Sequence, residues 1–308
     1  MSVSRVTVAV CTWNRQELLR QTLEEMTKLS IPAGLEWELV VVNNNCTDAT
    51  DDVLASFASR LPIRRLFQPV PGLSNARNLV TLMKTGEYII WTDDDVLVAP
   101  DWLQNYVKAF DALPEASVFG GPVEPWFPNT PPEWLEKTWS SIANAYASID
   151  YGNELLPLSH LRVPFGANMA LRADCMHQFP FNPALGIRPG SRMGGEETDV
   201  VRRALASGAT GWWIPDARVK HYIPPARQTL KYLREWYYAY GLYLGQNGDR
   251  HGTTHLLGRP LWLWKQVMVR EFRYQLKRHN TGTYEWMDDL IEASVARGQL
   301  RSFKRDRL

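Results

Sequence analysis

Three consecutive aspartates end the apolar run Ile89-Ile90-Trp91 and give the chain its clearest chemical signal. Carboxylates this close together repel one another, and removing them from water is costly unless a cation compensates their charge. Mg²⁺ and Mn²⁺ bind one or two carboxylates together with the phosphates of a substrate. We therefore interpret Asp93-Asp94-Asp95 as a site for a metal ion and a diphosphate. The alternative is a solvated turn in which an aspartate caps a helix.

Two further segments suit anion binding and proton transfer. Gly72 permits a tight turn, and a helix beginning at Ser74 would direct its N-terminus and Arg77 at a phosphate or a base. In Gly194–Asp199, acids follow flexible glycines at a helix start, where a carboxylate is a suitable general base for an acceptor hydroxyl. Both segments also fit ordinary solvated helix starts, where acids are favourable. His221 stands alone, and a lone histidine is more often packed in a core than bound to a ligand.

The elements that must position these residues alternate between strand and helix over the first 120 residues. The pattern predicts strands at 6–11, 37–42, 63–67 and 88–91, and helices at 16–29, 49–58 and 74–84. This alternation favours a parallel α/β sheet, in which ligands bind beyond the carboxyl ends of the strands. Four polar clusters fall at those ends: Thr12–Arg15, Asn43–Asn45, Pro71–Ser74 and Asp93–Asp95.

After residue 120 the alternation stops. Residues 121–160 are rich in proline and tryptophan and predict an insertion with one or two short helices. Beyond it we expect strands near 163–165, 168–171 and 212–214, and helices at 197–206, 227–247, 259–279 and 283–297. The predicted organisation is a catalytic domain over 1–225, with a nucleotide-binding half (1–120) and an acceptor-side half (121–225), followed by a helical C-terminal extension over 226–308.

Composition narrows the class of protein. The 308 residues suffice for one large domain with an appendage, and 13 of them are tryptophans, which stack on sugar rings and also fill cores. Cys11, Cys46 and Cys175 fit neither a zinc pattern nor a disulfide framework, so we expect a reducing cytoplasm. The N-terminus lacks a signal-peptide pattern, and no run of about 18 apolar residues could span a bilayer. No nucleic-acid partner is expected.

The last ninety residues hold twice as many basic as acidic residues. An anionic partner, such as the inner face of a membrane or a phosphorylated acceptor, is one interpretation, and a solvated helical face is the other. On the helix predicted from 259, Leu261, Trp262, Trp264, Met268 and Phe272 fall toward one side, flanked by Lys265, Arg270, Arg273 and Lys277. Such a helix suits peripheral membrane association. Packing on the catalytic domain, or on a second subunit in a homodimer, is the alternative.

Taken in order, these motifs resemble bacterial glycosyltransferase family 2, which has the GT-A fold. Thr12–Arg15 is similar to the family's first nucleotide-binding turn, Val40–Asp48 to its second-strand motif and Gly72–Asn78 to its third. Asp93–Asp95 resembles the family's DxD metal motif. Further along, Gly166–Arg172 is similar to the acceptor-side loop, Glu196-Glu197 stand where the family carries Glu-Asp, and His221 falls where related enzymes carry a histidine near the diphosphate.

The resemblance implies an inverting glycosyltransferase of polysaccharide biosynthesis (EC 2.4), of the hexosyl- or N-acetylhexosaminyltransferase type. It implies a nucleotide-diphospho-sugar donor, with uridine as the expected base, and a glycan, lipid-linked or other hydroxyl acceptor. Glu197 is the implied catalytic base, and Mn²⁺ or Mg²⁺ is the implied cofactor, bound by Asp95, Asp93 and His221. The implied donor-binding residues are Thr12, Asn14, Arg15, Asn43, Asn45, Arg77, Asp93 and Asp94. The implied acceptor-side residues are Gly166, Asn168, Glu196 and Trp212. The tryptophans of the insertion and Trp212-Trp213 are candidates for stacking on sugar faces.

Two residues depart from the family pattern. Asn43 stands where the family has an aspartate that reads the base, and an amide both donates and accepts hydrogen bonds, so base recognition differs. Glu197 is one methylene longer than the usual aspartate, which requires a different position of the loop or of the acceptor.

Two other classes of protein stay open at this point. A nucleotidyltransferase also uses paired aspartates on an α/β sheet, but the sequence has no Gly-rich nucleotide loop at its N-terminus. A non-catalytic sugar-binding protein is the other alternative, and the retained aspartate triplet and Glu197 argue against it.

Overall fold

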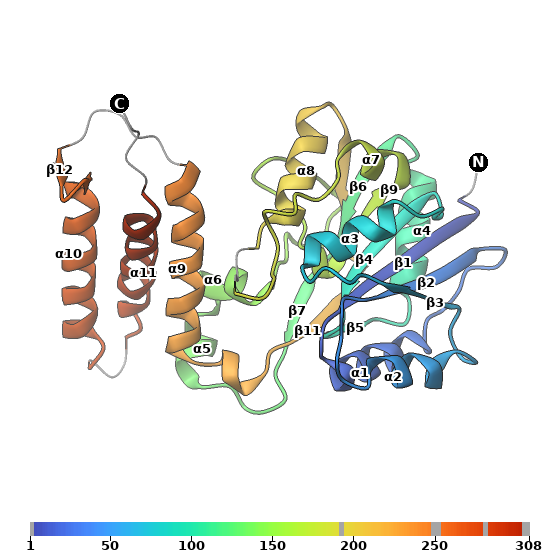
Figure 1. The fold of residues 1–308 in the computed structure, drawn as a ribbon, viewed down its shortest axis with the longest axis horizontal. Helices are drawn as coiled ribbons and strands as arrows, with labels where there is room; N and C mark the ends of the chain where they lie inside the picture. The colour runs from blue at the N-terminus through green and yellow to red at the C-terminus, as the bar shows by residue number, and fades with distance from the viewer. Residues whose placement is uncertain (1–2, 191–193, 248–253, 280–282, 304–308) are drawn as a thin grey trace. The chain divides into compact units, whose positions relative to one another are not determined.

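The structure, a computed structural model, describes residues 3–190, 194–247, 254–279 and 283–303 (Figure 1). It divides into two compact units. The sheet unit comprises residues 1–126 and 147–222, and the helical unit comprises residues 127–146 and 223–308. Residues 127–146, which belong to the predicted Pro/Trp-rich insertion, therefore group with the C-terminal helices.

An eight-stranded sheet forms the centre of the sheet unit, in the order β3-β2-β1-β4-β9-β6-β10-β8. β1 pairs in parallel with β2 and β4, and β2 with β3, whereas β9 runs antiparallel to β4 and β6. The prediction of a mostly parallel α/β sheet is confirmed. The strands are β1 (Arg5–Thr12), β2 (Glu36–Asn43), β3 (Ile63–Phe67), β4 (Tyr88–Asp93), β6 (Ala116–Gly120), β8 (Leu156–Pro157), β9 (Met169–Arg172) and β10 (Thr210–Trp213).

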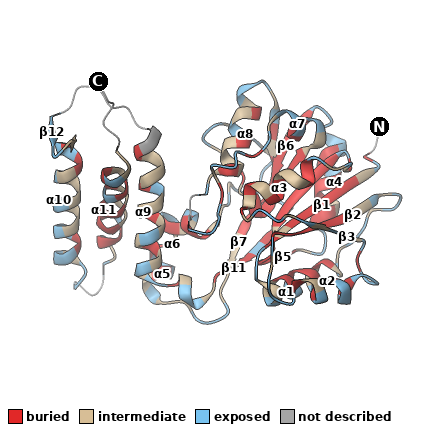
Figure 2. Ribbon diagram, in the orientation of Figure 1, coloured by how far each residue is buried: buried red, intermediate tan, exposed pale blue. Residues whose placement is uncertain are grey.

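Helices cover both faces of this sheet because both faces of its central strands are apolar. Successive side chains of a strand point to opposite faces, so Val8 and Val10 enter one core and Ala9 enters the other. The first face packs on α1 (Gln16–Met26), α2 (Thr50–Phe57) and α4 (Trp102–Ala112). The second packs on α3 (Leu73–Thr81), α7 (Ala173–Gln178) and α8 (Glu196–Ala206). Figure 2 shows the central strands buried between these layers.

A small second sheet lies beside the aspartate triplet. It consists of β5 (Val96–Val98), β7 (Val123–Trp126) and β11 (Val219–Tyr222), in the order β5-β11-β7. β11 pairs His221 with Val96, the residue that directly follows the triplet. The sequence patterns did not predict β5 or β7, and the strand that they predicted near 163–165 is an irregular segment before Gly166. Pieces of three or four residues are too short to show a dependable period.

The helical unit contains three long helices, α9 (Leu230–Asn247), α10 (Leu261–Lys277) and α11 (Trp286–Ser302), which correspond to the predicted C-terminal helices. The short elements α5 (Glu133–Lys137), α6 (Trp139–Ile142), η1 (Ala143–Tyr146) and η3 (Pro225–Arg227) accompany them. Trp139 stacks on Tyr146 with their ring centroids 5.3 Å apart. The tryptophans of the insertion, predicted as candidates for sugar stacking, therefore include members of this unit's own aromatic core.

Helices α9 and α11 meet at glycines. A Cβ atom at Gly241 would collide with the Val295 carbonyl oxygen, and one at Gly298 would collide with the Tyr238 carbonyl oxygen. At Gly245 it would meet the Ser302 hydroxyl. The two backbones approach so closely that only glycine fits at these positions.

Among the described residues, no helix combines the length and the apolar character needed to cross a membrane.

Candidate active site

Strand register brings the predicted motifs together at one edge of the large sheet. Thr12 at the end of β1 lies opposite Asn43 at the end of β2, and Cys11 lies opposite Asp93 at the end of β4. The short 3-10 helix η2 (Gly166–Asn168) leads into β9 at the same edge, because Met169 is the partner of Trp91 on β4. The edge formed by the carboxyl ends of the strands therefore gathers the nucleotide-binding and acceptor-side motifs.

The second and third aspartates of the triplet form a turn between β4 and β5. Arg15 holds this turn, since its Nη1 atom donates to Asp94 Oδ1 at 2.9 Å and to Asp95 Oδ2 at 2.8 Å. In an extended segment the Asp94 side chain would alternate to the face opposite Asp95. It does not do so here, because the backbone turns at these two residues. Both carboxylates point at the same guanidinium nitrogen.

The carboxylates of the triplet are crowded and largely removed from water. Burial raises the pKa of Asp94 to about 6, repulsion from Asp95 adds to the rise, and attraction to Arg15 opposes it. Burial likewise raises the pKa of Asp93, with Arg77 opposing the rise and Asp95 adding to it. The predicted electrostatic strain of three adjacent carboxylates is thus present, and Arg15 and Arg77 relieve only part of it.

The residues predicted to bind the metal ion have suitable donor atoms. His221 Nε2 lies 3.4 Å from Asp95 Oδ1, and 29% of the Asp93 side-chain surface is exposed. Within the described ranges, no group of three or more His, Cys, Asp or Glu side chains is arranged to hold a metal ion. Carboxylate oxygens and an imidazole nitrogen are donor types that Mn²⁺ or Mg²⁺ accepts, and these ions take further ligands from substrate phosphates or water. The strained carboxylates supply the charge that such an ion requires.

Arg77 links the aspartate triplet to the acidic pair at the start of α8. It is buried, and its Nη1 atom donates to Glu196 Oε1 at 2.8 Å. Its Nη2 atom lies 3.4 Å from Asp93 Oδ1. A buried arginine is stable only with such partners, so the carboxylates fix the guanidinium in one place.

Gly166 leaves the space that the Arg77 guanidinium fills. A Cβ atom at Gly166 would collide with Nη2 of Arg77, and the guanidinium also lies over the rings of Trp91 and Phe181, at 5.9 and 5.4 Å. The loop predicted to lie on the acceptor side thus supports an arginine predicted to bind the donor, a contact that the sequence patterns did not reveal. The sequence signal for this contact was Gly166 itself, because glycine has no Cβ atom.

Gly166→Ala should therefore move Arg77 away from Asp93 and Glu196. We expect a loss of about 1–3 kcal/mol in the free energy of unfolding, the usual cost of overpacking, and weaker binding of nucleotide with Mn²⁺. Urea unfolding and thermal shift measure the two effects. Gly194→Ala is the matched control, since a Cβ atom there meets nothing within 4 Å, and it should change stability by less than about 0.5 kcal/mol. Equal losses in the two variants would contradict the packing role of Gly166.

Glu196 and Glu197 begin α8 directly after Gly195, whose φ of 96° places it in the left-handed region. Glu196 is buried on Arg77, and burial together with the neighbouring Glu197 raises its pKa to about 8, while Arg77 opposes the rise. The Oε2 atom of Glu197 is buried and accepts no hydrogen bond from the described residues. Glu196 Oε2 is likewise buried without a hydrogen-bond donor among the described residues, and Glu196 differs in that its Oε1 atom accepts from Arg77.

The asparagines of the nucleotide-binding half mainly hold the loops at this edge. Asn43 Nδ2 donates to Asp51 Oδ1 at 2.8 Å, and Asn43 Oδ1 accepts from the backbone N–H of Cys46 at 2.8 Å. Asn14, at a φ of 52°, accepts from the backbone N–H of Thr47 at 2.7 Å. Asn45, at a φ of 61°, is exposed. Asn43, which departs from the family pattern, is therefore hydrogen-bonded to a carboxylate in the helix that follows its strand, that of Asp51 in α2.

Two residues at this edge, Asp51 and Trp13, carry no sequence pattern that assigns them a site role. Asp51, the partner of Asn43, lies in the first turn of α2, and an acid at a helix start is too common to signal a site. Trp13 exposes 42% of its surface between Thr12 and Asn14. Its position within the first motif was visible in the sequence, but only the structure shows that this large apolar ring faces solvent.

Two of the predicted acceptor-side residues, Asn168 and Trp212, lie in or against the core of the sheet unit. Asn168 is fully buried: Oδ1 accepts from Trp102 and Tyr106, and Nδ2 donates to two backbone carbonyl oxygens. Trp212 is half-buried against the core. Its neighbour Trp213, also expected to stack on sugars, is fully buried, so that expectation is wrong. The four hydrogen bonds of the Asn168 side chain fix the position of η2.

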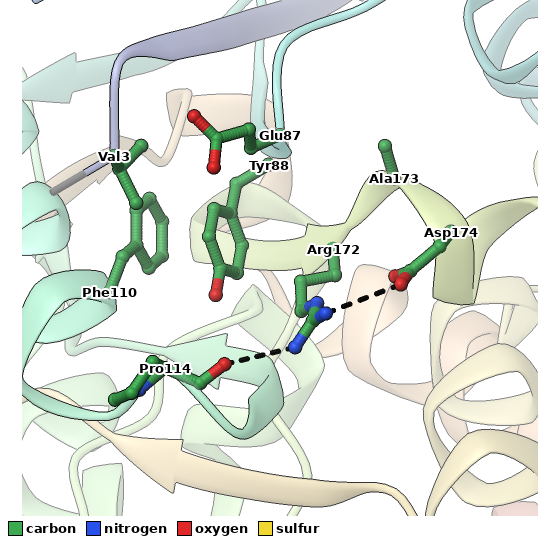
Figure 3. Close-up of a pocket in the computed structure, with 8 residues that line it drawn as sticks. All are labelled: Val3, Glu87, Tyr88, Phe110, Pro114, Arg172, Ala173 and Asp174. Atoms are coloured by element: carbon green, nitrogen blue, oxygen red, sulfur yellow. Dashed lines mark hydrogen bonds and ion pairs between the residues drawn. The ribbon is translucent and has the colours of Figure 1, made fainter. Parts of the chain in front are cut away.

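A cavity of about 350 Å³ lies at the opposite edge of the sheet (Figure 3). It is lined by Tyr88, the first residue of β4, and by Arg172, the last residue of β9. Arg172 donates to the Pro114 carbonyl oxygen at 2.9 Å and pairs with Asp174 at 3.4 Å. None of the predicted site residues lines this cavity.

Comparison with known proteins decides the family. Residues 7–165, about half of the chain, match the sequence model of Glycosyl transferase family 2. The chain belongs to this family. The matched range contains the motifs from Thr12 to Asp95 and ends just before Gly166.

Relatives of this glycosyltransferase support the same assignment. The succinoglycan biosynthesis protein ExoM of Rhizobium meliloti is 26% identical over 233 residues, which cover 74% of this chain and 70% of that protein. Validoxylamine A glucosyltransferase of Streptomyces hygroscopicus subsp. limoneus is 30% identical over 131 residues, 42% of this chain and 29% of that protein.

The solved structures confirm the GT-A glycosyltransferase fold. The mannosyltransferase PcManGT of Pyrobaculum calidifontis, in complex with GDP-Man and Mn²⁺, matches with a TM-score of 0.63 and 15% identity, covering 98% of this chain and 87% of that one. S. aureus TarS 1-349 in complex with UDP-GlcNAc matches with a TM-score of 0.52 and 15% identity, covering 94% and 79%. The protein is therefore a glycosyltransferase with the GT-A fold.

Proposed function

We propose that this glycosyltransferase inverts the anomeric centre of a nucleotide-diphospho-sugar, with Glu197 as its general base. The observation that carries the proposal is the bridge made by Arg77, which joins Asp93 to the Glu196-Glu197 pair. Through it, residues suited to a diphosphate and a carboxylate suited to proton transfer meet at one edge of the sheet.

In the proposed reaction, the oxygen of an acceptor hydroxyl attacks the anomeric carbon of the donor sugar. The bond from that carbon to the diphosphate oxygen breaks on the opposite side, and the nucleoside diphosphate leaves. The hydroxyl proton passes to Glu197, whose Oε2 atom accepts no hydrogen bond from the rest of the described chain. The transition state has oxocarbenium character, as in glycoside hydrolysis.

The proposed donor site lies at the ends of β1, β2 and β4. Asp93, Asp95 and His221 would hold a divalent cation, which when bound neutralises the charge that develops on the leaving diphosphate. Arg77 adds a fixed positive charge beside Asp93. Trp13 offers an exposed ring on which the base stacks, and the Asn43–Asp51 pair lies at the end of the neighbouring strand. We propose uridine as the base and a glycan or lipid-linked hydroxyl compound as the acceptor.

A panel of UDP-, GDP- and dTDP-sugars, each tested by thermal shift with and without Mn²⁺, tests the donor. The true donor should raise the unfolding temperature in the presence of Mn²⁺, because a ligand that binds only the folded state stabilises it by mass action. Stabilisation by a GDP-sugar but by no UDP-sugar would contradict the proposed base.

Product analysis with the same donor tests the reaction class. Release of a nucleoside diphosphate supports sugar transfer, whereas release of pyrophosphate would identify a nucleotidyltransferase. Absence of any turnover, even slow donor hydrolysis, across the whole panel would favour a sugar-binding protein without catalysis.

A further inference from the structure

Helix α10 turns an apolar face outward. Six of its large hydrophobic residues each expose at least 43% of their surface: Leu261, Trp262, Met268, Val269, Phe272 and Leu276. The opposite side of the helix is buried in the helical unit through Leu263 and Tyr274. Figure 2 shows exposed turns along the length of α10. Helices on protein surfaces normally present polar residues to solvent, so this outward face needs a covering partner.

The exposed residues lie on one side of the helix. Their spacings of three, four and seven residues place them within about 60° on either side of Lys265, at 100° per residue. The stripe runs for roughly 22 Å, from Leu261 to Leu276, at a rise of 1.5 Å per residue. It differs from the predicted stripe at three residues. Trp264, expected on this side, is half-buried and packs against the inner cluster, whereas Val269 and Leu276 belong to the exposed stripe.

The β-hairpin before α10 extends the apolar surface. Its strands are β12 (His255–Leu256) and β13 (Arg259–Pro260), and Leu257 at the turn exposes 83% of its surface. Leu257 has a φ of 54°, in the left-handed region that leucine rarely adopts. Trp264 Nε1 donates to the Leu256 carbonyl oxygen at 3.1 Å and so ties the hairpin to α10. The fold thus holds a leucine in solvent at a conformational cost, an outlier that points to function.

The charges of α10 indicate what covers this face. The helix contains a single acid, Glu271, which is turned to Arg234 and Arg297, at 3.1 and 3.0 Å. Arg270 and Lys277, predicted on the flanks, pair with Asp289 on α11. Lys265 lies exposed in the middle of the apolar stripe. Arg273 stands at its edge, where it is exposed and its Nε atom lies 3.4 Å from Asp289 Oδ1. The outward face of α10 is therefore apolar and cationic.

A second copy of this chain is a poor partner for such a face. Pairing two stripes would bury two Lys265 ammonium groups. Because α10 offers no outward carboxylate, nothing would compensate the free energy of removing these charges from water. An anionic lipid surface meets both requirements. The apolar side chains enter the boundary of the acyl chains, while the Lys265 stem lies along them and its ammonium group reaches a phosphate.

We propose that α10 and the hairpin 255–260 bind the surface of an anionic lipid bilayer, with Leu257 and the α10 stripe inserted at the level of the headgroups. This surface belongs to the helical unit and does not depend on the donor or on the catalytic base.

Sedimentation of the full chain with lipid vesicles tests the proposal. We expect binding to vesicles of phosphatidylcholine with phosphatidylglycerol, weaker binding at high salt, and much weaker binding to phosphatidylcholine alone. The triple variant Met268→Ser, Phe272→Ser, Leu276→Ser should weaken binding to the anionic vesicles by about tenfold or more, because three large apolar side chains are lost. Lys265→Glu should reduce binding to anionic vesicles only.

The matched control is Leu82→Ser with Leu161→Ser, two leucines of the sheet unit that each expose 80% of their surface. This variant should bind vesicles as the unmodified chain does, and circular dichroism should show that all variants are folded. Equal loss in the control and in the triple variant would overturn the assignment to α10. Sedimentation velocity provides a second check: a dimer that the triple variant dissociates, without vesicle binding, would show that a second copy covers the face.

Discussion

Glu197→Gln should lower the rate of sugar transfer by about two to four orders of magnitude, the usual contribution of a general base, and should leave donor binding unchanged. Glutamine preserves the size of the side chain and its hydrogen-bonding atoms, but it cannot take a proton from the acceptor hydroxyl at neutral pH. Single-turnover transfer measures the chemical step, and thermal shift with the donor and Mn²⁺ measures binding.

Glu196→Gln is the control for this experiment, because the two glutamates are neighbours and both lie near Arg77. Glu196 is buried on Arg77, so its replacement should disturb the position of the guanidinium and weaken donor binding more than it slows chemistry. If Glu196→Gln abolished transfer with normal donor binding while Glu197→Gln stayed active, the roles of the two carboxylates would have to be exchanged.

Asp95→Ala should remove the stabilisation that Mn²⁺ adds to the nucleotide-bound protein. Stabilisation by mass action reaches about 2.7 kcal/mol at a ligand concentration one hundred times its Kd, which makes the loss easy to measure by thermal unfolding. The comparison is between unfolding temperatures with nucleotide alone and with nucleotide plus Mn²⁺, so any change in the stability of the variant itself cancels.

Asp93→Ala should have the same effect, whereas Asp101→Ala, which removes an exposed carboxylate before α4, should leave the Mn²⁺ response intact. Asp94→Ala separates two roles of the triplet. Asp94 contacts Arg15 and is not one of the proposed metal ligands, so its loss should change basal stability more than the Mn²⁺ response. A full Mn²⁺ response in both Asp93→Ala and Asp95→Ala would exclude this metal site.

Much of the fold was predictable because its strongest signals are local. The strands at 6–11, 37–42 and 88–91 are apolar runs interrupted only by Thr7 and Glu38, as expected for strands covered on both faces, and each is followed by polar residues. The long C-terminal helices show regular apolar spacing. Short strands such as β7 and β8 were not predicted, because they exist through pairing with distant segments and have too few residues to show a period.

The sequence also predicted which motifs would meet, since the carboxyl ends of parallel strands share one edge. It did not predict how their side chains interact. Arg15 was expected at the nucleotide, yet in the structure it holds Asp94 and Asp95, and a turn of two residues decides this geometry. Glu196 was expected beside the acceptor, yet it is the partner of Arg77. Contacts between residues 79 to 119 positions apart leave no pattern in a single sequence.

The outward face of α10 was also predicted only in part from the sequence. Amphipathic spacing was visible, and it correctly indicated a helix with one apolar and one charged side. Which apolar residues the protein itself would cover depends on α11, whose Asp289 draws Arg270 and Lys277 inward. The packing of α10 on α11 decides that Trp264 is half-buried whereas Phe272 is exposed.

The glycines at which α9 and α11 meet restrict how the helical unit can change over evolutionary time. At Gly241 and Gly298 an added methyl group would strike backbone, which cannot move aside as a flexible side chain can. A substitution at either position requires the helices to separate. The outward residues of α10 are exposed, so a change there does not disturb the packing of α9 on α11. The unit thus combines a seam that only glycine fits with a surface that can change without refolding.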